Sequence, residues 1–150
     1  MQPDLILMAR KINDEMTQYI IQSMLKMLIQ QNVNTVGLKL GILGISYKEN
    51  TNDLRNSLAL KLIKELHEYG FNCSVHDPMH YADTDAITLE PFDALRDSSV
   101  VIIVVGHDYY RDLGLNKIMS LCKKPSIVID IPNLFVKESK EIKGLIYWNL

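Results

Sequence analysis

The chain has 150 residues, of which 47% are hydrophobic, and this suits one domain with its own core. Its 16 basic and 18 acidic residues give a net charge of −2, which disfavours nucleic acid and anionic membranes as partners. Two cysteines, Cys73 and Cys122, are too few for a disulfide framework and favour a reducing compartment. Because the sequence has neither a signal-like start nor an apolar run of about 20 residues, we expect it in the cytoplasm.

A long helix is predicted from Asp4 to Gln31, about 42 Å at about 1.5 Å per residue. One apolar stripe has helical spacing and consists of Leu5, Ala9, Ile12, Met16, Ile20, Met24 and Met27. A second stripe consists of Leu7, Ile21, Leu25 and Leu28. Two apolar faces must both be covered. The helix therefore packs either on its own sheet alone or, as we prefer, also on another domain or subunit.

Strands and helices alternate after a polar break at 32–37. Strands are predicted at 38–43, 71–75, 86–89, 100–105, 126–130 and 145–150, and helices at 58–69 (capped by Ser57), 91–97 and 115–122. The unbroken β-branched run at 100–105 is typical of a strand buried on both faces of a parallel sheet. The pattern predicts an α/β fold, a three-layer Rossmann-like parallel sheet preceded by the long helix. Strand ends near Leu43, His76, Val105 and Asp130 should share one edge.

The segment from Gly44 to Ser57 is the richest candidate binding loop. In open parallel sheets, ligands sit beyond the carboxyl ends of the strands. Lys48 and Arg55 place two cations on a loop that enters a helix, where free N–H groups favour anions. The segment fits a phosphate or pyrophosphate site, and it fits a solvated polar loop equally well.

A dinucleotide site at the first turn is disfavoured, because the glycines there follow G-x-x-G and not G-x-G-x-x-G. Asp77 ends the second strand, where a Rossmann acid meets a ribose. Since Pro78 follows it, we favour strand termination over ribose recognition. His76, Asp77 and His80 have no fourth partner nearby in the sequence, so we interpret them as loop residues and expect no metal site. His107 and Asp108 are further candidates to line the cleft.

One motif carries a family resemblance: Gly41-Ile-Leu-Gly-Ile-Ser-Tyr-Lys48, then Thr51, Asp53, Arg55 and Ser57, then Asp77-Pro78. It resembles the C-terminal, UDP-binding domain of the UDP-glucose/GDP-mannose dehydrogenase family. The Ala9-Arg10-x-x-Asn13 stretch is similar to the family's long central helix. The resemblance implies that residues 1–36 come from the central dimerisation region and that residues 37–150 form the nucleotide-sugar-binding domain.

The resemblance also implies a function. Family members use two NAD in succession to oxidise the C6 hydroxyl of a nucleotide sugar to a carboxylate. By position, Tyr47 and Lys48 match substrate contacts, with a UDP-sugar as the expected ligand. Arg55 matches a residue that reaches the NAD, which is bound mainly by an N-terminal domain outside this sequence. The resemblance further implies a homodimer through the N-terminal helix. No catalytic residue is expected here, since neither cysteine lies in the family's Cys motif.

One position departs from the family pattern. Pro132 stands where the family has an Arg that contacts the nucleotide sugar, and proline supplies neither a charge nor a donor. A free-standing nucleotide-binding or dimerisation module without dehydrogenase activity is the alternative. A signalling receiver is excluded, because Gly44 and Ile45 follow the first strand where a receiver needs acidic residues.

Overall fold

A computed structural model describes residues 3–80, 90–124 and 127–150, so the strand predicted at 86–89 lies outside the described residues. The described residues form a five-stranded, all-parallel sheet with the order β2-β1-β3-β4-β5. Its strands are β1 (Lys39–Leu43), β2 (Asn72–His76), β3 (Val100–Ile103), β4 (Ile127–Asp130) and β5 (Ile146–Asn149).

The carboxyl ends of the strands meet at one edge, as predicted. Leu43 at the end of β1 pairs with His76 of β2 and with Ile103 of β3, and Ile103 pairs with Asp130 of β4. The strand expected to reach residue 105 ends at Ile103, because the amides of residues 104 and 105 both turn toward the Leu43 carbonyl. The parallel α/β sheet read from the β-branched runs is therefore confirmed.

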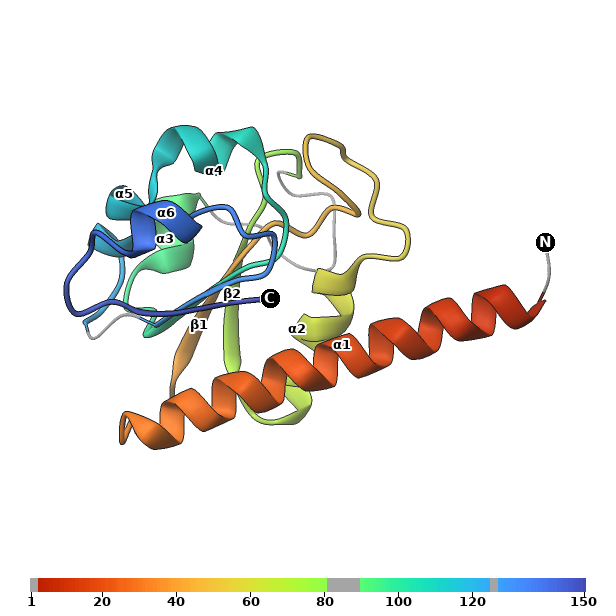
Figure 1. Ribbon diagram of the computed structural model, residues 1–150, viewed down its shortest axis with the longest axis horizontal. Helices are drawn as coiled ribbons and strands as arrows, with labels where there is room; N and C mark the ends of the chain where they lie inside the picture. The colour runs from red at the N-terminus through yellow and green to blue at the C-terminus, as the bar shows by residue number, and fades with distance from the viewer. Residues whose placement is uncertain (1–2, 81–89, 125–126) are drawn as a thin grey trace.

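Helices cover both faces of the sheet and make three layers (Figure 1). In the described ranges they are α1 (Pro3–Gln30), α2 (Leu58–Glu68), α3 (Pro91–Leu95), α4 (Asp108–Leu113), α5 (Leu115–Ser120) and α6 (Val136–Ser139). α1 and α2 share one hydrophobic cluster with alternate strand residues such as Ile42 and Ile102. α3, α4 and α5 share a second cluster with Leu43 and Ile103 on the opposite face. Burial on both faces explains the unbroken apolar strands.

The burial of the long helix α1 differs more between its two ends than between its two predicted apolar faces. Its C-terminal half packs on the sheet through four residues that are 0% exposed: Ile20, Ile21, Met24 and Leu28. Ile21 and Leu28 belong to the second predicted stripe, and Ile20 and Met24 belong to the first, yet all four pack in one core. In this half of α1 the domain's own sheet therefore covers residues of both stripes.

The N-terminal half of α1 extends past the rest of the molecule (Figure 1). Four of its large apolar side chains are 54–62% exposed: Leu5, Leu7, Met8 and Ile12. An ion pair between Lys61 and Asp14 and a hydrogen bond from Gln18 to Glu65 (3.0 Å) join α1 to α2 where the overhang begins. Neither α1 nor any other helix within the described ranges is long and apolar enough to cross a membrane.

Candidate functional site

The sheet has its topological switch point between β1 and β3. The chain leaves β1 toward β2 on one side, and β3 lies on the other. In open α/β sheets this is where a crevice for ligands forms beyond the carboxyl edge. The loop after β1, residues 44–57, and the end of β3, residues 104–107, meet at this point. This edge is therefore the candidate site.

Gly44 begins the loop after β1 with a backbone that only glycine fits. Its φ is +91°, and a Cβ there would lie 2.7 Å from the Val105 Cβ and 2.9 Å from the Val105 amide nitrogen. Its own amide donates to the His76 carbonyl at 2.8 Å. The glycine thus lets the β1 loop pass directly against the end of β3.

The buried Asp77 side chain holds the start of this loop by hydrogen bonds. It is 0% exposed, and its Oδ2 accepts hydrogen bonds from the amides of Ile45 (2.7 Å) and Ser46 (3.2 Å) and from Ser46 Oγ (3.1 Å). Its Oδ1 accepts from the Met79 amide at 2.7 Å. A ribose cannot reach a carboxylate that is enclosed in this way. Asp77 therefore both ends the strand and holds the loop, a role that its place in the sequence did not reveal.

His107 joins the end of β3 to the same network. The ring is 1% exposed, its Nε2 lies 3.0 Å from Asp77 Oδ2, and its Nδ1 accepts from the Asn50 amide at 2.9 Å. An amide can only donate, so Nδ1 carries the lone pair and Nε2 carries the hydrogen that is donated to Asp77. The Asp108 amide donates in turn to Asn50 Oδ1 at 3.1 Å. His107 thus lies at this edge, but its ring is 1% exposed and does not line an open cleft as we had expected.

The charge state of this network follows from burial and hydrogen bonding. Burial alone raises the pKa of Asp77, but the hydrogen bonds that it accepts, led by that of His107, outweigh burial and bring the pKa to about 2. Burial lowers the pKa of His76 to about 4 against the opposing pull of the Asp77 charge. At neutral pH this network therefore holds the charged Asp77 carboxylate beside a neutral His76.

The far end of the loop is fastened at the start of α2. Ser57 Oγ donates to the Ile45 carbonyl at 2.5 Å and accepts from the Leu60 amide at 3.2 Å. The predicted helix cap is confirmed. The Leu60 amide is therefore already hydrogen-bonded to this hydroxyl, although we had expected the amides at this helix N-terminus to be free to bind an anion.

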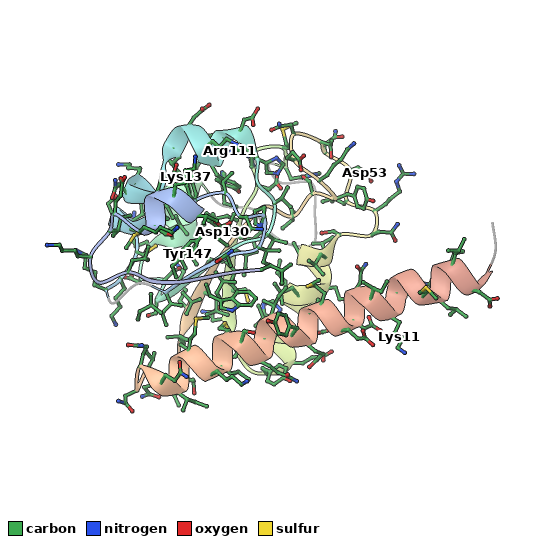
Figure 2. The ribbon with its side chains drawn as sticks, viewed as in Figure 1. Lys11, Asp53, Arg111, Asp130, Lys137 and Tyr147 are labelled. Atoms are coloured by element: carbon green, nitrogen blue, oxygen red, sulfur yellow. The ribbon has the colours of Figure 1, made fainter. Side chains whose placement is uncertain are left out.

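The three predicted site residues all lie on this one loop. Tyr47 is 58% exposed, Lys48 is exposed, and the Arg55 side chain is 87% exposed. Arg55 forms a two-point contact with Asp53, with Nη2 to Oδ2 at 2.9 Å and Nε to Oδ1 at 3.0 Å, and this lowers the pKa of Asp53 to about 2. Asp53 lies on the outer part of the loop (Figure 2). The buried network thus presents the three side chains to solvent.

Comparison with known proteins decides the family. Residues 41–137 match the model for the UDP binding domain of the UDP-glucose/GDP-mannose dehydrogenase family. The chain belongs to this family. The match runs from Gly41 in β1 to Lys137 in α6 and takes in the candidate site. The resemblance carried by the Gly41–Lys48 motif is thereby confirmed.

Relatives within the family cover nearly the whole chain. It is 32% identical to Protein CapL of Staphylococcus aureus over 99% of its length, and 27% identical to a UDP-N-acetyl-D-glucosamine 6-dehydrogenase of Salmonella typhi over 94%. The solved UDP-N-acetyl-mannosamine dehydrogenase Cap5O of S. aureus is 25% identical over 93% of this chain, with a TM-score of 0.72. These matches cover 35%, 34% and 32% of the relatives, so the chain spans about a third of their length.

Pro132, the position that the resemblance pairs with an Arg of the family, also lies at this edge. Pro132 is exposed, and its Cβ lies 3.4 Å from where a Cβ on Gly106 would stand. The turn that carries it is held by Asp130, whose carboxylate accepts from the Leu134 amide at 2.9 Å and from the Tyr147 hydroxyl. Figure 2 shows Tyr147 beside Asp130. The turn at Pro132 is thus well anchored, and its side chain offers neither a charge nor a hydrogen-bond donor.

The two cysteines lie away from the candidate site at the carboxyl edge of the sheet. Burial raises the pKa of Cys73 to about 12 and that of Cys122 to about 11. Both are half-buried thiols, which suits a structural role. The positive charge of Lys39 lowers the pKa of Cys122, but burial outweighs it. Within residues 3–80, 90–124 and 127–150, no three His, Cys, Asp or Glu side chains gather as metal ligands would.

Asn50 is the residue at this site that sequence reasoning missed. Its φ is +58°, a left-handed conformation that asparagine tolerates better than most residues. The only sequence signal was an Asn in a polar loop, which predicts a turn and not a contact with β3. The link from Asn50 to His107 spans 57 positions, and neither residue type predicts it alone.

Proposed function

We propose that this chain is the nucleotide-sugar-binding domain of an NAD-dependent nucleotide-sugar 6-dehydrogenase, with a UDP-sugar as substrate. In the whole enzyme the sugar C6 hydroxyl is oxidised to a carboxylate, and the cysteine nucleophile comes from another part of the protein. One observation carries the proposal. The buried Asp77 network holds a loop of the matched UDP binding domain at the switch point, with Tyr47 and Lys48 facing solvent.

Lys48 is the group that we assign to the anionic part of the ligand. It is an exposed point charge on a loop whose base is fixed by buried hydrogen bonds. A phosphate or diphosphate needs few contacts of this kind when they are held in place. Tyr47 is 58% exposed on the same loop and offers a ring face and a hydroxyl to the nucleotide sugar.

The residues at the first turn do not fit a dinucleotide bound by this domain, because Asp77 is enclosed and serves the loop. Arg55 does fit a contact with NAD that is held by another domain. Its guanidinium projects from the surface and is 87% exposed. NAD accepts the hydride when it is bound; what this chain contributes is the charge of Arg55, turned toward a neighbouring domain.

We also propose a homodimer formed through the N-terminal half of α1. Four large apolar side chains in that half are 54–62% exposed, and none of them packs in either hydrophobic cluster of the domain. Apolar area of this kind on a projecting helix suits a second copy of the chain. The two half-buried free thiols suit a reducing compartment, and we place the protein in the cytoplasm.

The test is an NMR titration of the 150-residue chain with UDP. We expect shifts clustered at residues 46–57 and an affinity of roughly 1 mM or weaker, since the neighbouring domain and the family Arg are not there to complete the site. Raising the salt concentration should weaken binding, because the charges on this loop are exposed. Lys48→Ala should abolish the shifts, and Lys64→Ala, an exposed lysine on α2, should not. Shifts confined to another surface contradict the proposal.

A further inference from the structure

His107 connects three segments that are far apart in the sequence. It stands after β3, touches Asp77 at the end of β2, and accepts a hydrogen bond from Asn50 in the β1 loop. We propose that His107 is a positioning residue: its hydrogen bond to the Asn50 amide holds the Tyr47–Lys48 segment in its ligand-binding conformation. The ligand part of this proposal rests on the proposed function, and the loop-holding part does not.

Asp77 dictates which nitrogen of His107 carries the hydrogen. A carboxylate only accepts hydrogen bonds, so the Nε2 at 3.0 Å from Asp77 Oδ2 must donate. This leaves Nδ1 as an acceptor, which is what the Asn50 amide requires at 2.9 Å. Asp77 therefore selects the tautomer that binds the loop, in the way that a second group orients a histidine in many active sites.

Asn50 is well placed to transmit this contact to the ligand side. It is two positions from Lys48, and it is fastened twice to the end of β3, by its amide to His107 and by its Oδ1 to the Asp108 amide at 3.1 Å. Beyond it, the loop closes on itself, since the Tyr47 amide donates to the Asp53 carbonyl at 2.6 Å. The exposed segment 47–50 thus has a rigid attachment at one end and a turn at the other.

The environment of the ring explains why it must stay neutral to hold the loop. The titratable groups that face it are the Asp77 carboxylate, the His76 ring and the Tyr110 phenol, whose ring centroid lies 5.8 Å away. A second proton would sit on Nδ1 and point at the Asn50 N–H, donor against donor. A hydrogen on Nδ1 is therefore incompatible with the contact with Asn50, and only the ring that carries its hydrogen on Nε2 alone holds the loop.

The decisive variant is His107→Gln. Its side-chain amide can still donate to Asp77 from near the Nε2 position, but it offers no acceptor where Nδ1 was. We expect the Asn50 amide to exchange with solvent about tenfold faster, and UDP to bind several-fold more weakly than to the native chain. The matched control is His67→Gln, a change at an exposed histidine on α2, which should alter neither value.

The outcomes separate this proposal from the proposed function. If UDP does not bind the native chain, the proposed function fails, and Asn50 exchange decides the positioning role by itself. Unchanged Asn50 exchange in His107→Gln overturns the positioning role. UDP affinity equal to that of the native chain overturns it as well. Nitrogen-15 shifts of the native ring provide a test that needs no variant: a hydrogen on Nδ1 at neutral pH contradicts the proposal, and one on Nε2 supports it.

Discussion

Asp77 shows how much one buried carboxylate can hold together. It accepts hydrogen bonds from three backbone amides and two side chains, and it has no exposed surface. Asp77→Ala leaves these donors buried without their acceptor, so we expect it to lower the free energy of unfolding by about 3–5 kcal/mol. Urea denaturation measures this. Asp112→Ala, at an exposed position on α4, should change stability little, and equal losses in the two variants would contradict this account.

His76 gives the domain a predictable response to pH. Its pKa is about 4 in the fold against 6.5 for an unperturbed histidine, because burial disfavours the charged ring. The unfolded chain therefore takes up the proton first as pH falls. The contribution of the neutral His76 ring to folding stability is therefore present in full above pH 6.5. It is lost progressively as pH falls through 4. We expect a loss of roughly 2 kcal/mol between pH 7 and pH 5, measured by denaturation at each pH.

The pH prediction has a direct check. The His76 ring should titrate near pH 4 by NMR, well below the value of 6.5 for an unperturbed histidine. A His76 ring that titrates near 6.5 would show that burial does not disfavour its charge. Asp77 does not confuse the measurement, because its pKa shift from 3.8 to about 2 affects stability only at lower pH.

At the scale of elements, the sequence predicted the strands and helices that a local residue pattern determines. β-branched runs located β3 and β4, and helical spacing located α1 and α2. The short helices α4 and α6, of six and four residues, were missed. Neither has a side-chain cap at its N-terminus, but α5 has none either and was predicted, so the missing cap alone does not explain the difference. The two ends of α1 look alike in the sequence. Which end is buried depends on where the sheet lies, and periodicity carries no such information.

The same limit applies to the candidate site. Its exposed residues, Tyr47, Lys48 and Arg55, follow one strand and could be found from one stretch of sequence. The groups that hold their loop, Asp77 and His107, come from two other strands, 30 positions apart from each other. Sequence reasoning noted both residues but could not pair them, because the pairing depends on strand order.

The turn out of β1 offers a test of close packing between elements. Gly44 and Gly70 have nearly the same backbone, with φ of +91° and +89°, but only Gly44 has atoms within 4 Å of the place a Cβ would take. Gly70→Ala should therefore cost about 1 kcal/mol, for backbone strain alone. Gly44→Ala should cost clearly more, about 2–4 kcal/mol, because the methyl group also meets Val105. Equal losses in thermal or chemical unfolding would show that the contact is relieved easily.

At the scale of the whole molecule, the two surfaces that we assign to partners are formed by different residues. The β1 loop opens at the carboxyl edge of the sheet, whereas the N-terminal half of α1 extends beyond the domain (Figure 1). The core does not depend on that half, since the α1 residues fully buried in it are Ile20, Ile21, Met24 and Leu28. Association and ligand binding should therefore be separable by mutation, which makes the dimer testable without loss of the fold.

Association through α1 should give a mass near twice 17.2 kDa in sedimentation or light scattering. Leu7→Asp and Ile12→Asp place charges on side chains that are 61% and 54% exposed, so they should yield folded monomers. Ile29→Asp is the matched control, because Ile29 is 74% exposed at the other end of the same helix and should leave the dimer intact. Ile21→Asp is no test of association, since Ile21 is 0% exposed and a charge there would unfold the domain. A native chain that stays monomeric at high concentration would contradict the proposed dimer.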